Sequence, residues 1–417
     1  MIVEITIENF LSIKEPITLS LDASAGKKLE NNLIQLSDKE RLLKSAVVYG
    51  ANASGKSNLI RSVLFIWFLV KNSHNFNVET ELNKIGYPRI PFKLDSASLK
   101  KPSKFEIVFI KDDVRYKYGF ACDDKQIIEE HLYYWPKGRE SLIFSRTKSS
   151  EFKFTEDKSQ QKLIEKQMND NVLYLSRATQ LGYDKTRAPY EFIVNDIVVN
   201  PNRTDLTIQQ IYDDPKIKNK ILDILKKADF GGIVDIEVNK EKKTINGFEF
   251  KFENENASVN PLKSKEQDFY DVKFLHKNDK DSLVKLGFNE ESHGTQKTIA
   301  MLGPIFEVFE TGKTLFIDEF EVNLHPNITE FLIKLFHSKY NTKNGQLIIT
   351  THDTTLLKNK DLFRMDQVYV CSKAPNKWTK VNSLLDFDLR QNLSFENAYL
   401  NGRVGGLPFI DETFFEE

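Results

Sequence analysis

Hydrophobic and polar residues alternate at the start of the chain. Residues 2–8 place apolar and polar side chains on opposite faces, and 17–21 repeats this period of two, which indicates half-buried strands. Residues 45–49 form a short apolar run that ends at Gly50, as is typical of a buried strand entering a tight turn. In residues 56–71 the apolar positions recur at helical spacing. The pattern therefore predicts strands, a turn and a helix.

The middle of the chain first looks strand-rich and then helical. Alternating or apolar runs predict four strands, at 105–110, 114–121, 127–135 and 141–146. Helical spacing predicts three helices, at 159–168, 190–199 and 214–228. Two further runs, 234–238 and 248–252, predict a strand pair. No segment sustains apolar heptads, so we expect no long coiled-coil arms.

Strands and helices alternate in the last third of the chain. The expected strands are 269–275, 284–288, 314–317, 346–350 and 366–371. The expected helices are 295–310, 327–336 and 354–358. Strand, helix and strand at this spacing predict an α/β fold with a buried parallel sheet.

Composition excludes several classes of protein. The 417 residues include 59 Lys and Arg against 60 Asp and Glu, a net charge of −1, with 40% hydrophobic residues. Such a chain can build a core and is not a polycationic nucleic-acid coat, although a local basic patch remains compatible with this sum. Cys122 and Cys371 lie far apart, which favours a reducing, cytoplasmic setting over a disulfide framework. The longest apolar run, 63–70, is shorter than the roughly 20 residues that span a bilayer, and the N-terminus does not resemble a signal peptide.

The strongest chemical signal is a glycine-rich turn between the strand 45–49 and the helix that follows. It fits the phosphate-binding pattern G-x-x-x-x-G-K-[ST] with Gly50, Ala51, Asn52, Ala53, Ser54, Gly55, Lys56 and Ser57. In such a loop successive backbone N–H groups and the helix N-terminus hold phosphates. We expect Lys56 to neutralise the β- and γ-phosphates of ATP and the Ser57 hydroxyl to bind Mg²⁺.

Two more strands end in residues suited to the same chemistry. The apolar strand 314–317 runs into Asp318 and Glu319, and we expect Asp318 to hold the Mg²⁺ and Glu319 to activate the attacking water. The strand 346–350 leads to His352, which could contact the γ-phosphate and that water. A solvated acid pair and a surface histidine are the structural alternatives.

A further turn, 291–296, directly precedes a predicted helix. Ser292, Gly294 and Thr295 could offer a hydroxyl and free N–H groups to an anion. Ser292 or Thr295 could equally be an ordinary helix N-cap. The residues alone do not decide between these two interpretations.

Taken in order, the segments GANASGKSN (50–58, ending in Asn58), ESHGTQ (291–296), TLFIDE (314–319) and QLIITTHD (346–353) resemble the ABC-type ATPases of the SMC/RecF/OLD group. The opening IENFLSIKE is similar to their first strand. The chain most resembles prokaryotic AAA/ABC-type ATPases of abortive-infection and other anti-phage systems, such as the AbiL and PARIS ATPases. The likeness is weak between about 150 and 265.

The resemblance implies a fold and a domain organisation. It implies an ABC-type ATPase head with a mixed sheet and an inserted α+β subdomain. We expect an N-terminal ATPase lobe with a β-rich part at 1–150, an inserted, mostly helical subdomain at 151–268 and a C-terminal ATPase lobe at 269–417.

It also implies roles for individual residues. Ser292 and Gly294 match the signature motif, which contacts the γ-phosphate held by the opposite protomer. Asn323, within 322–326, matches the D-loop, and His352 matches the switch histidine. By this likeness two protomers enclose two ATP molecules with Mg²⁺, as a homodimer or part of a higher homo-oligomer.

The chain departs from the family pattern in two places. No glutamine occurs between Ser57 and Lys125, so no residue matches the Q-loop. Only 29 residues follow Asp388, too few for a Toprim nuclease domain of roughly 100 residues, and Asp386 and Asp388 are expected to serve loop or cap chemistry.

Two functions then compete. The first is an ATP-driven sensor or scaffold of an anti-phage system that controls a separate effector, a nuclease or toxin from the same operon. The second is a RecF-like DNA-repair ATPase whose ATP-bound dimer clamps DNA. The lysine runs 226–227 and 240–243 would serve the second as a DNA patch, or they are a solvated face. A transporter subunit is disfavoured by the missing Q-loop glutamine.

Overall fold

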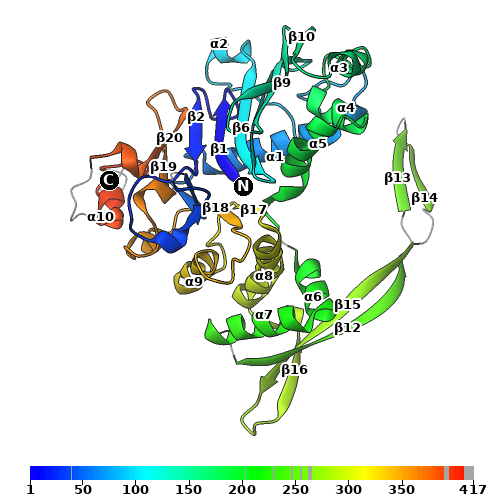
Figure 1. Cartoon of the computed structure of the whole chain (residues 1–417). Coiled ribbons are helices and arrows are strands. Elements are labelled where there is room, and N and C mark those ends of the chain that lie inside the picture. The colour runs from blue at the N-terminus through cyan, green and yellow to red at the C-terminus, as the bar shows by residue number, and fades with distance from the viewer. Residues whose placement is uncertain are drawn as a thin grey trace, which may run out of the picture. The chain divides into compact units, whose positions relative to one another are not determined.

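The computed structural model describes residues 1–38, 40–201, 203–228, 230, 232–245, 248–253, 256–261, 265–388 and 394–407 (Figure 1). These residues divide into two compact units. The first unit comprises Met1–Asn200, Val308–Val322 and Pro326–Glu417, and the second comprises Pro201–Glu307 and Asn323–His325. The first division thus falls after Asn200, whereas the sequence suggested one after 150, because the helices beyond 150 pack into the core of the first unit.

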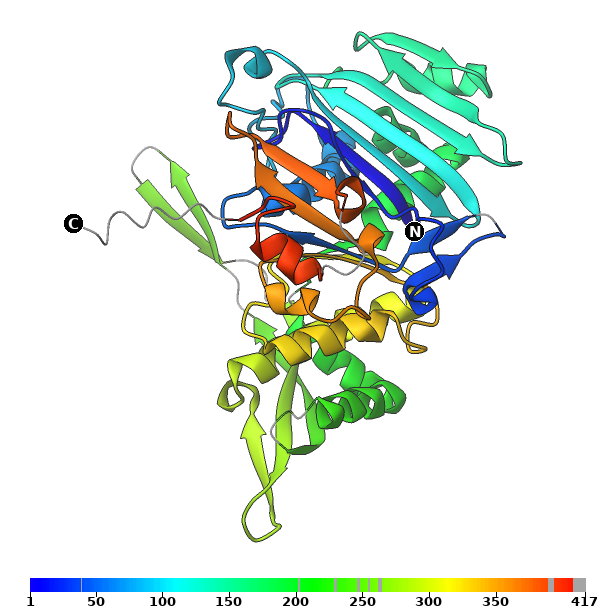
Figure 2. The same cartoon turned by 90° about the vertical axis from the view of Figure 1, so that its left-hand side faces the viewer.

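The first unit contains a seven-stranded antiparallel sheet, in which β1 (Ile2–Glu8) lies between β2 (Ile17–Ser20) and β6 (Ser103–Lys111). Four strands continue the sheet beyond β6 in sequence order: β7 (Val114–Cys122), β8 (Ile127–Trp135), β9 (Ser141–Thr147) and β10 (Glu151–Phe154). Figure 2 shows this layer as a broad, twisted sheet. The strands predicted for this region are confirmed.

A second sheet in the first unit carries the candidate chemistry. Its order is β11-β17-β18-β5-β19-β20, with bounds Ile197–Val199, Thr314–Ile317, Gln346–Thr351, Ser45–Tyr49, Val368–Lys373 and Thr379–Ser383. The first five strands are parallel to one another, and β20 is antiparallel to β19. The buried parallel sheet is confirmed, and together with the helices of this unit it gives the predicted α/β fold.

One helix prediction in this unit is wrong in part. Residues 190–199 were expected to be helical, but α5 (Asp184–Glu191) passes into a π-helical turn at Phe192–Asp196, and Ile197–Val199 form β11. This strand consists of three β-branched residues, which favour extended backbone. Its parallel pairing with β17 supplies hydrogen bonds that a local pattern cannot reveal.

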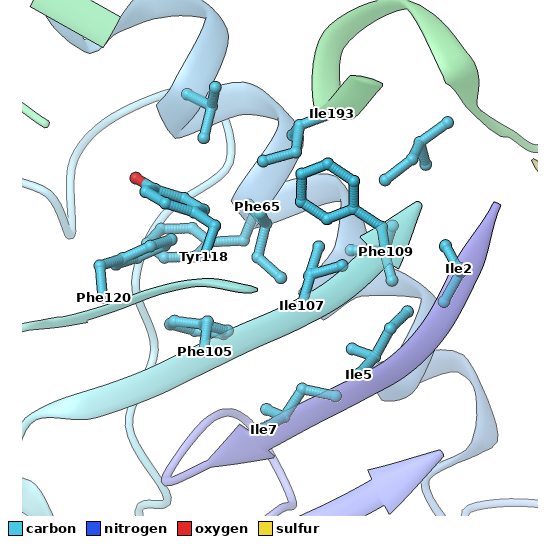
Figure 3. Close-up of a cluster of buried hydrophobic side chains, with 14 of the residues drawn as sticks. Ile2, Ile5, Ile7, Phe65, Phe105, Ile107, Phe109, Tyr118, Phe120 and Ile193 are labelled. Atoms are coloured by element: carbon cyan, nitrogen blue, oxygen red, sulfur yellow. The ribbon is translucent and has the colours of Figure 1, made fainter. Parts of the chain in front are cut away.

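The helix α1 (Lys56–Asn72) shares one hydrophobic cluster with both sheets of the first unit. It buries residues around much of its circumference, which is typical of a helix enclosed on several sides. Figure 3 shows Phe65 from this helix against Phe105, Ile107 and Phe109 of β6. The Phe65 and Phe105 rings lie 5.0 Å apart. The loop that begins α1 is therefore attached to a helix that packs in the core of the unit.

Smaller elements complete the first unit. Its other helices are α2 (Ser96–Leu99), α3 (Lys158–Glu165), α4 (Tyr174–Gln180), α9 (Pro326–Phe336) and α10 (Phe395–Leu400), and β3 (Leu33–Gln35) pairs with β4 (Arg41–Leu43). Short 3-10 turns lie at Glu30–Asn32, Ser73–Asn75, Thr354–Leu357, Met365–Gln367 and Leu384–Asp386.

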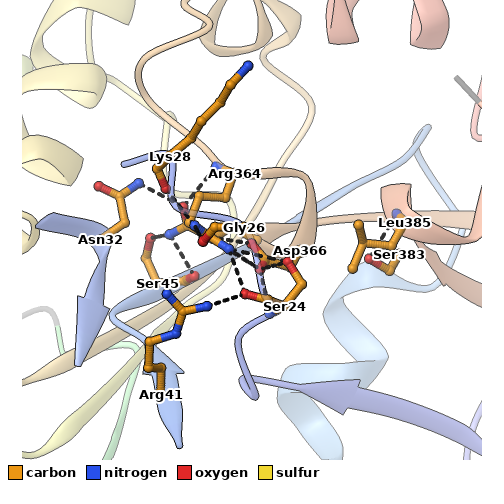
Figure 4. Close-up of polar contacts among 11 residues, drawn as sticks. Ser24, Gly26, Lys28, Asn32, Arg41, Ser45, Arg364, Asp366, Ser383 and Leu385 are labelled. Atoms are coloured by element: carbon orange, nitrogen blue, oxygen red, sulfur yellow. Dashed lines mark hydrogen bonds and ion pairs between the residues drawn. The ribbon is translucent and has the colours of Figure 1, made fainter. Parts of the chain in front are cut away.

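A buried ion pair ties the N-terminal segment of the first unit to its C-terminal part (Figure 4). Arg364 and Asp366 lie 2.8 Å apart with side chains 5% and 4% exposed. Arg364 also donates to the carbonyls of Gly26 and Lys28, and Asp366 accepts from Ser24. These bonds join segments more than 330 residues apart in sequence.

The second unit combines helices with long strands. It contains α6 (Thr204–Asp213), α7 (Pro215–Lys227), most of α8 (His293–Thr311) and a 3-10 turn at Phe288–Glu290. Its three-stranded sheet has the order β12-β15-β16, with bounds Ile233–Ile245, Lys265–Lys277 and Leu283–Gly287. Residues 151–268 are thus mainly helical up to Lys227 and strand-forming beyond it.

The expected pairing of 234–238 with 248–252 is wrong. β12 pairs along its length with β15, while β13 (Phe248–Glu253) pairs with β14 (Asn256–Pro261). β13 and β14, which are adjacent in sequence, form their own hairpin, and the strands that flank them in sequence, β12 and β15, pair with each other. No helix in the described part of the chain has the length and apolar character needed to cross a membrane.

Candidate nucleotide-binding site

Three parallel strands bring the residues that are predicted to bind phosphates to one edge of the sheet. β18 lies between β5 and β17, with Thr351 paired to Tyr49 and Ile349 paired to Ile317. Because the strands run in the same direction, their carboxyl ends meet at that edge. The glycine-rich loop after β5, the two acids after β17 and His352 after β18 therefore lie at the same edge of the sheet.

The glycine-rich loop has the backbone that its sequence predicts. Gly55 adopts φ 110°, a region that residues with a side chain rarely enter, and it forms the N-cap of α1 without a side-chain cap. A Cβ atom at Gly50 would clash with the backbone carbonyl of Cys371 and lie 2.6 Å from Ser54 Oγ, so a larger residue would not fit there. No side chain caps α1, and in its first turn the Asn58 N–H donates to the Gly55 carbonyl at 3.0 Å, so the N–H groups of Lys56 and Ser57 are left for an anion.

Lys56 is folded onto its own loop. Its ammonium group donates to the carbonyls of Gly50 at 2.6 Å and Ala51 at 3.0 Å. Burial lowers the pKa of Lys56, and the nearby thiol of Cys371 and the carboxylates of Glu321, Asp318 and Glu319 oppose this shift. The cation therefore lies among the acids of the neighbouring strand ends, as expected for a residue that neutralises phosphates.

The two acids after β17 are held in different ways. The Asp318 carboxylate accepts from the hydroxyl of Thr350 at 2.5 Å, and the Glu319 N–H donates to the same hydroxyl oxygen at 2.9 Å. The Asp318 N–H donates to the side chain of Asn200 at 2.7 Å. Glu319 is exposed and has φ 49°, a left-handed conformation that is strained by about 1 kcal/mol for a residue with a side chain.

His352 is half exposed and contacts one carboxylate. Its backbone N–H and its ring Nδ1 both lie against Glu321 Oε1, at 2.7 Å and 2.8 Å. Sequence reasoning singled out His352 but missed Glu321, which stands two residues beyond Glu319. The only local signal was a third acid in the run that follows β17.

Several residues that hold the glycine-rich loop in place were also not predicted from the sequence. Thr379 of β20 donates to the Ser54 carbonyl at 2.7 Å, and Ser12 Oγ lies 2.7 Å from Thr379 Oγ1. The side chain of Asn58 donates to Ser12 at 2.6 Å, so it braces the loop in addition to any contact with nucleotide. The Ala51 N–H donates to the carbonyl of Gly406 at 2.8 Å. The loop is thus held by both ends of the chain.

The second unit gathers the other predicted residues. Ser292 caps α8, because its hydroxyl accepts from the Thr295 N–H at 3.1 Å. A Cβ atom at Gly294 would lie 3.2 Å from the Asn323 carbonyl, so the turn before α8 and the segment matched to the D-loop are neighbours. The hydrogen bond confirms that Ser292 caps the helix. Contact of Ser292 with a nucleotide stays a prediction.

Comparison with known families gives a match over residues 45–358, to the family described as "AAA domain, putative AbiEii toxin, Type IV TA system". The chain belongs to this family. No curated protein matches it.

Solved SMC head domains are similar at low identity. The SMC head domain from Thermotoga maritima is 14% identical, with a TM-score of 0.38, over 92% of this chain and 98% of that one. An SMC head bound to the C-winged helix domain of ScpA is 15% identical, with a TM-score of 0.44, over 96% and 99%. The Pyrococcus furiosus SMC head bound to the C-terminal domain of ScpA is 13% identical, with a TM-score of 0.40, over 96% and 98%.

The donor groups of this AAA domain suit Mg²⁺ bound together with phosphates. Among the residues that the structure describes, no three His, Cys, Asp or Glu side chains form a metal-binding group. Mg²⁺ usually takes one or two protein ligands and completes its shell with phosphate oxygens and water. Ser57 and Asp318 are the expected pair of protein ligands, with Asp318 held by Thr350.

Two further predictions concern Asp386 and the two cysteines. Asp386 accepts from the Ser383 N–H at 2.8 Å in a capping box, which confirms its expected cap chemistry. Cys122 and Cys371 are both buried and free, so neither forms a disulfide.

Proposed function

We propose that this AAA domain binds Mg²⁺ and ATP at the loop 50–57 and hydrolyses ATP. The observation that carries the proposal is the alignment of three parallel strand ends at one edge of the sheet. The register places the loop with Lys56 beside Asp318 and Glu319, and Thr350 hydrogen-bonds to both acids. Lys56 would neutralise the β- and γ-phosphates, Asp318 and Ser57 would hold Mg²⁺, and the exposed Glu319 would activate water.

The proposal includes a homodimer, or a larger homo-oligomer, that completes each site. Ser292, Gly294, Thr295 and Asn323 would face the γ-phosphate bound by a second copy. Supporting this, Gly294 and Asn323 are neighbours, and Ser292 is exposed at a helix N-terminus that favours anions. ATP binding would then close the dimer, and hydrolysis would open it.

At the level of the cell, we propose a sensor or scaffold subunit of a bacterial anti-phage, abortive-infection system in the cytoplasm. It would control a separate effector, a nuclease or toxin from the same operon. The family description, which names a Type IV TA system, supports a defence context.

Direct clamping of DNA is less favoured, because most of the lysines that could have formed a patch lie close to acids. Lys240 lies 2.8 Å from Asp268, and Lys227 lies 2.6 Å from Asp223. Lys243 is 3.5 Å from Glu241. Paired lysines present little net positive charge to a phosphate backbone.

Two variants test the ATPase. Lys56→Ala should lose ATP binding, whereas Glu319→Gln should bind ATP, fail to hydrolyse it and accumulate as a dimer, because only water activation is lost. Isothermal titration, phosphate release and light scattering measure these three properties. Glu330→Gln, on α9, is a control carboxylate and should behave as the parent does. Hydrolysis by Glu319→Gln at the parental rate would refute the assigned base.

Co-purification from the native operon tests the cellular role. We expect a second protein to accompany the parent chain and phage plating to fall when both genes are present. A chain that purifies alone and leaves plating unchanged would count against the sensor role while leaving the ATPase assignment intact.

A further inference from the structure

Glu321 makes an unusual double contact with His352. A single oxygen, Oε1, accepts from the His352 backbone N–H at 2.7 Å and lies 2.8 Å from ring Nδ1. The Glu321 side chain is 9% exposed, while the histidine side chain is 55% exposed. One end of the imidazole is therefore held from the protein side, and the rest of the ring faces outward.

The turn that carries Glu321 is itself fixed to β18. Phe320 is fully buried, and its N–H donates to the Thr350 carbonyl at 3.1 Å. The Val322 N–H donates to the Glu319 carbonyl at 3.1 Å and closes the turn. This one turn therefore presents Glu319 to the exterior and Glu321 to His352, so the two acids have fixed relative positions.

Stability does not explain why a carboxylate occupies this position. The second oxygen, Oε2, is buried and has no hydrogen-bond partner among the described residues. A buried carboxylate oxygen without a partner is unfavourable by about 1–3 kcal/mol or more. Groups that are placed at such a cost are found mostly at functional sites.

The geometry points to Glu321 as the positioning residue for His352 in ATP hydrolysis, an inference that rests on the proposed function. An ionised carboxylate can only accept hydrogen bonds, so the contact places a proton on Nδ1. Nε2 is then the ring atom available to the γ-phosphate and the attacking water. Second-shell carboxylates fix histidine tautomer and orientation in the same way at metal sites. The carboxylate also acts on Lys56, whose pKa it raises against burial.

A double-mutant cycle tests the inference, using Glu321→Ala, His352→Ala and the combined variant in the full chain with Mg²⁺ and ATP. Because Glu321 acts through His352, each single variant should lower kcat by roughly 10- to 100-fold with little change in KM. The combined variant should be no slower than His352→Ala alone. Two results would overturn the inference. One is a combined variant whose loss of kcat equals the product of the two single losses, and the other is parental turnover in Glu321→Ala.

Conservative and control variants separate positioning from a structural role. Glu321→Gln keeps an accepting oxygen and should retain more activity than Glu321→Ala, with an unchanged or raised thermal midpoint. A purely structural glutamate would instead lower the midpoint in both variants, a result that contradicts positioning. Glu330→Ala removes a carboxylate on α9 that accepts from the Asn359 side chain. This control variant should leave kcat unchanged.

Histidine nitrogen NMR provides a readout that needs no hydrolysis. The parent should show His352 protonated at Nδ1, assigned by loss of the signal in His352→Gln, and Glu321→Ala should lose that preference. An unchanged tautomer in Glu321→Ala would overturn the inference whether or not ATP is hydrolysed. A parent with the fixed tautomer but no ATPase activity would refute the proposed function and the hydrolytic role, while the contact itself would stand.

Discussion

The hydroxyl of Thr350 lies 2.5 Å from Oδ1 of Asp318, although 32 residues separate them in the chain. The same hydroxyl oxygen accepts from the Glu319 N–H at 2.9 Å. Thr350 is fully buried. One side chain on the middle strand thus orients both the expected metal ligand and the backbone of the expected base.

Thr350→Val should weaken the metal site, because valine has nearly the same shape but no hydroxyl. The Asp318 carboxylate and the Glu319 N–H would each lose a partner, and a hydrogen bond to a charged group contributes about 1.5–3 kcal/mol. We expect the Mg²⁺ concentration for half-maximal ATPase activity to rise roughly 10-fold or more. A Mg²⁺ titration measures this change, and Thr350→Ser should stay near the parent. Equal titrations for valine and serine would show that the hydroxyl is not needed.

Gly406→Ala should lower nucleotide affinity from a position far beyond the glycine-rich loop in sequence. Gly406 has φ 79°, and an added Cβ would lie 2.7 Å from Val370 Cγ1. The resulting shift, at about 1–3 kcal/mol, would displace the carbonyl that accepts from the Ala51 N–H. Titration with ATP measures the loss.

Gly402→Ala is the matched control for this change. Gly402 also has a left-handed backbone, at φ 70°, but its added Cβ would come no closer than 3.7 Å, to Leu407. It should therefore share the backbone strain and keep the parental affinity for ATP. Similar losses in both variants would show that strain, and not the contact with the loop, is responsible.

Ser292→Arg should block hydrolysis while ATP binding by a single protomer survives, because the bulky cation would occupy the expected dimer interface. Ser292→Asn should keep the helix cap, which contributes about 1 kcal/mol, without that bulk. Phosphate release and ATP titration separate the two effects. Loss of ATP binding in Ser292→Arg would indicate that the residue serves only the structure around α8.

His337 should make the fold less stable in acid. Burial lowers its pKa from 6.5 to about 3, and its ring lies 2.8 Å from the Ser45 hydroxyl. The unfolded chain takes up a proton below pH 6.5 and the folded chain does not, so this contribution falls as pH drops from 6.5 toward 3. The loss is about 1.4 kcal/mol per pH unit, or about 2 kcal/mol at pH 5.

Urea unfolding at pH 7 and pH 5 measures this dependence. His337→Gln should show a smaller difference between the two pH values than the parent. His293→Gln replaces an exposed histidine and should leave the parental difference unchanged. An equal pH dependence in parent and His337→Gln would show that this histidine does not control acid stability.

The sequence by itself determined the elements whose side-chain pattern is local. The strand Ser45–Tyr49, the loop Gly50–Ser57 and the strand Thr314–Ile317 were all predictable, because an apolar run, two glycines and a following acid pair are each read within a few residues. The start of α7 was also signalled locally, by the Asp214 side chain that accepts from the Lys216 N–H. These features specify the glycine-rich loop and the acid pair that follows the neighbouring strand.

Only the tertiary structure decided which distant residues become partners. Ile197–Val199 became a strand through pairing with β17, and β12 took β15 in place of its near neighbour. The contacts of Thr350 with Asp318, of Glu321 with His352 and of Gly406 with Ala51 join segments that carry no shared local pattern. The physical reason is that periodicity encodes which face of an element is buried, whereas hydrogen-bond partners across strand ends depend on strand order and register.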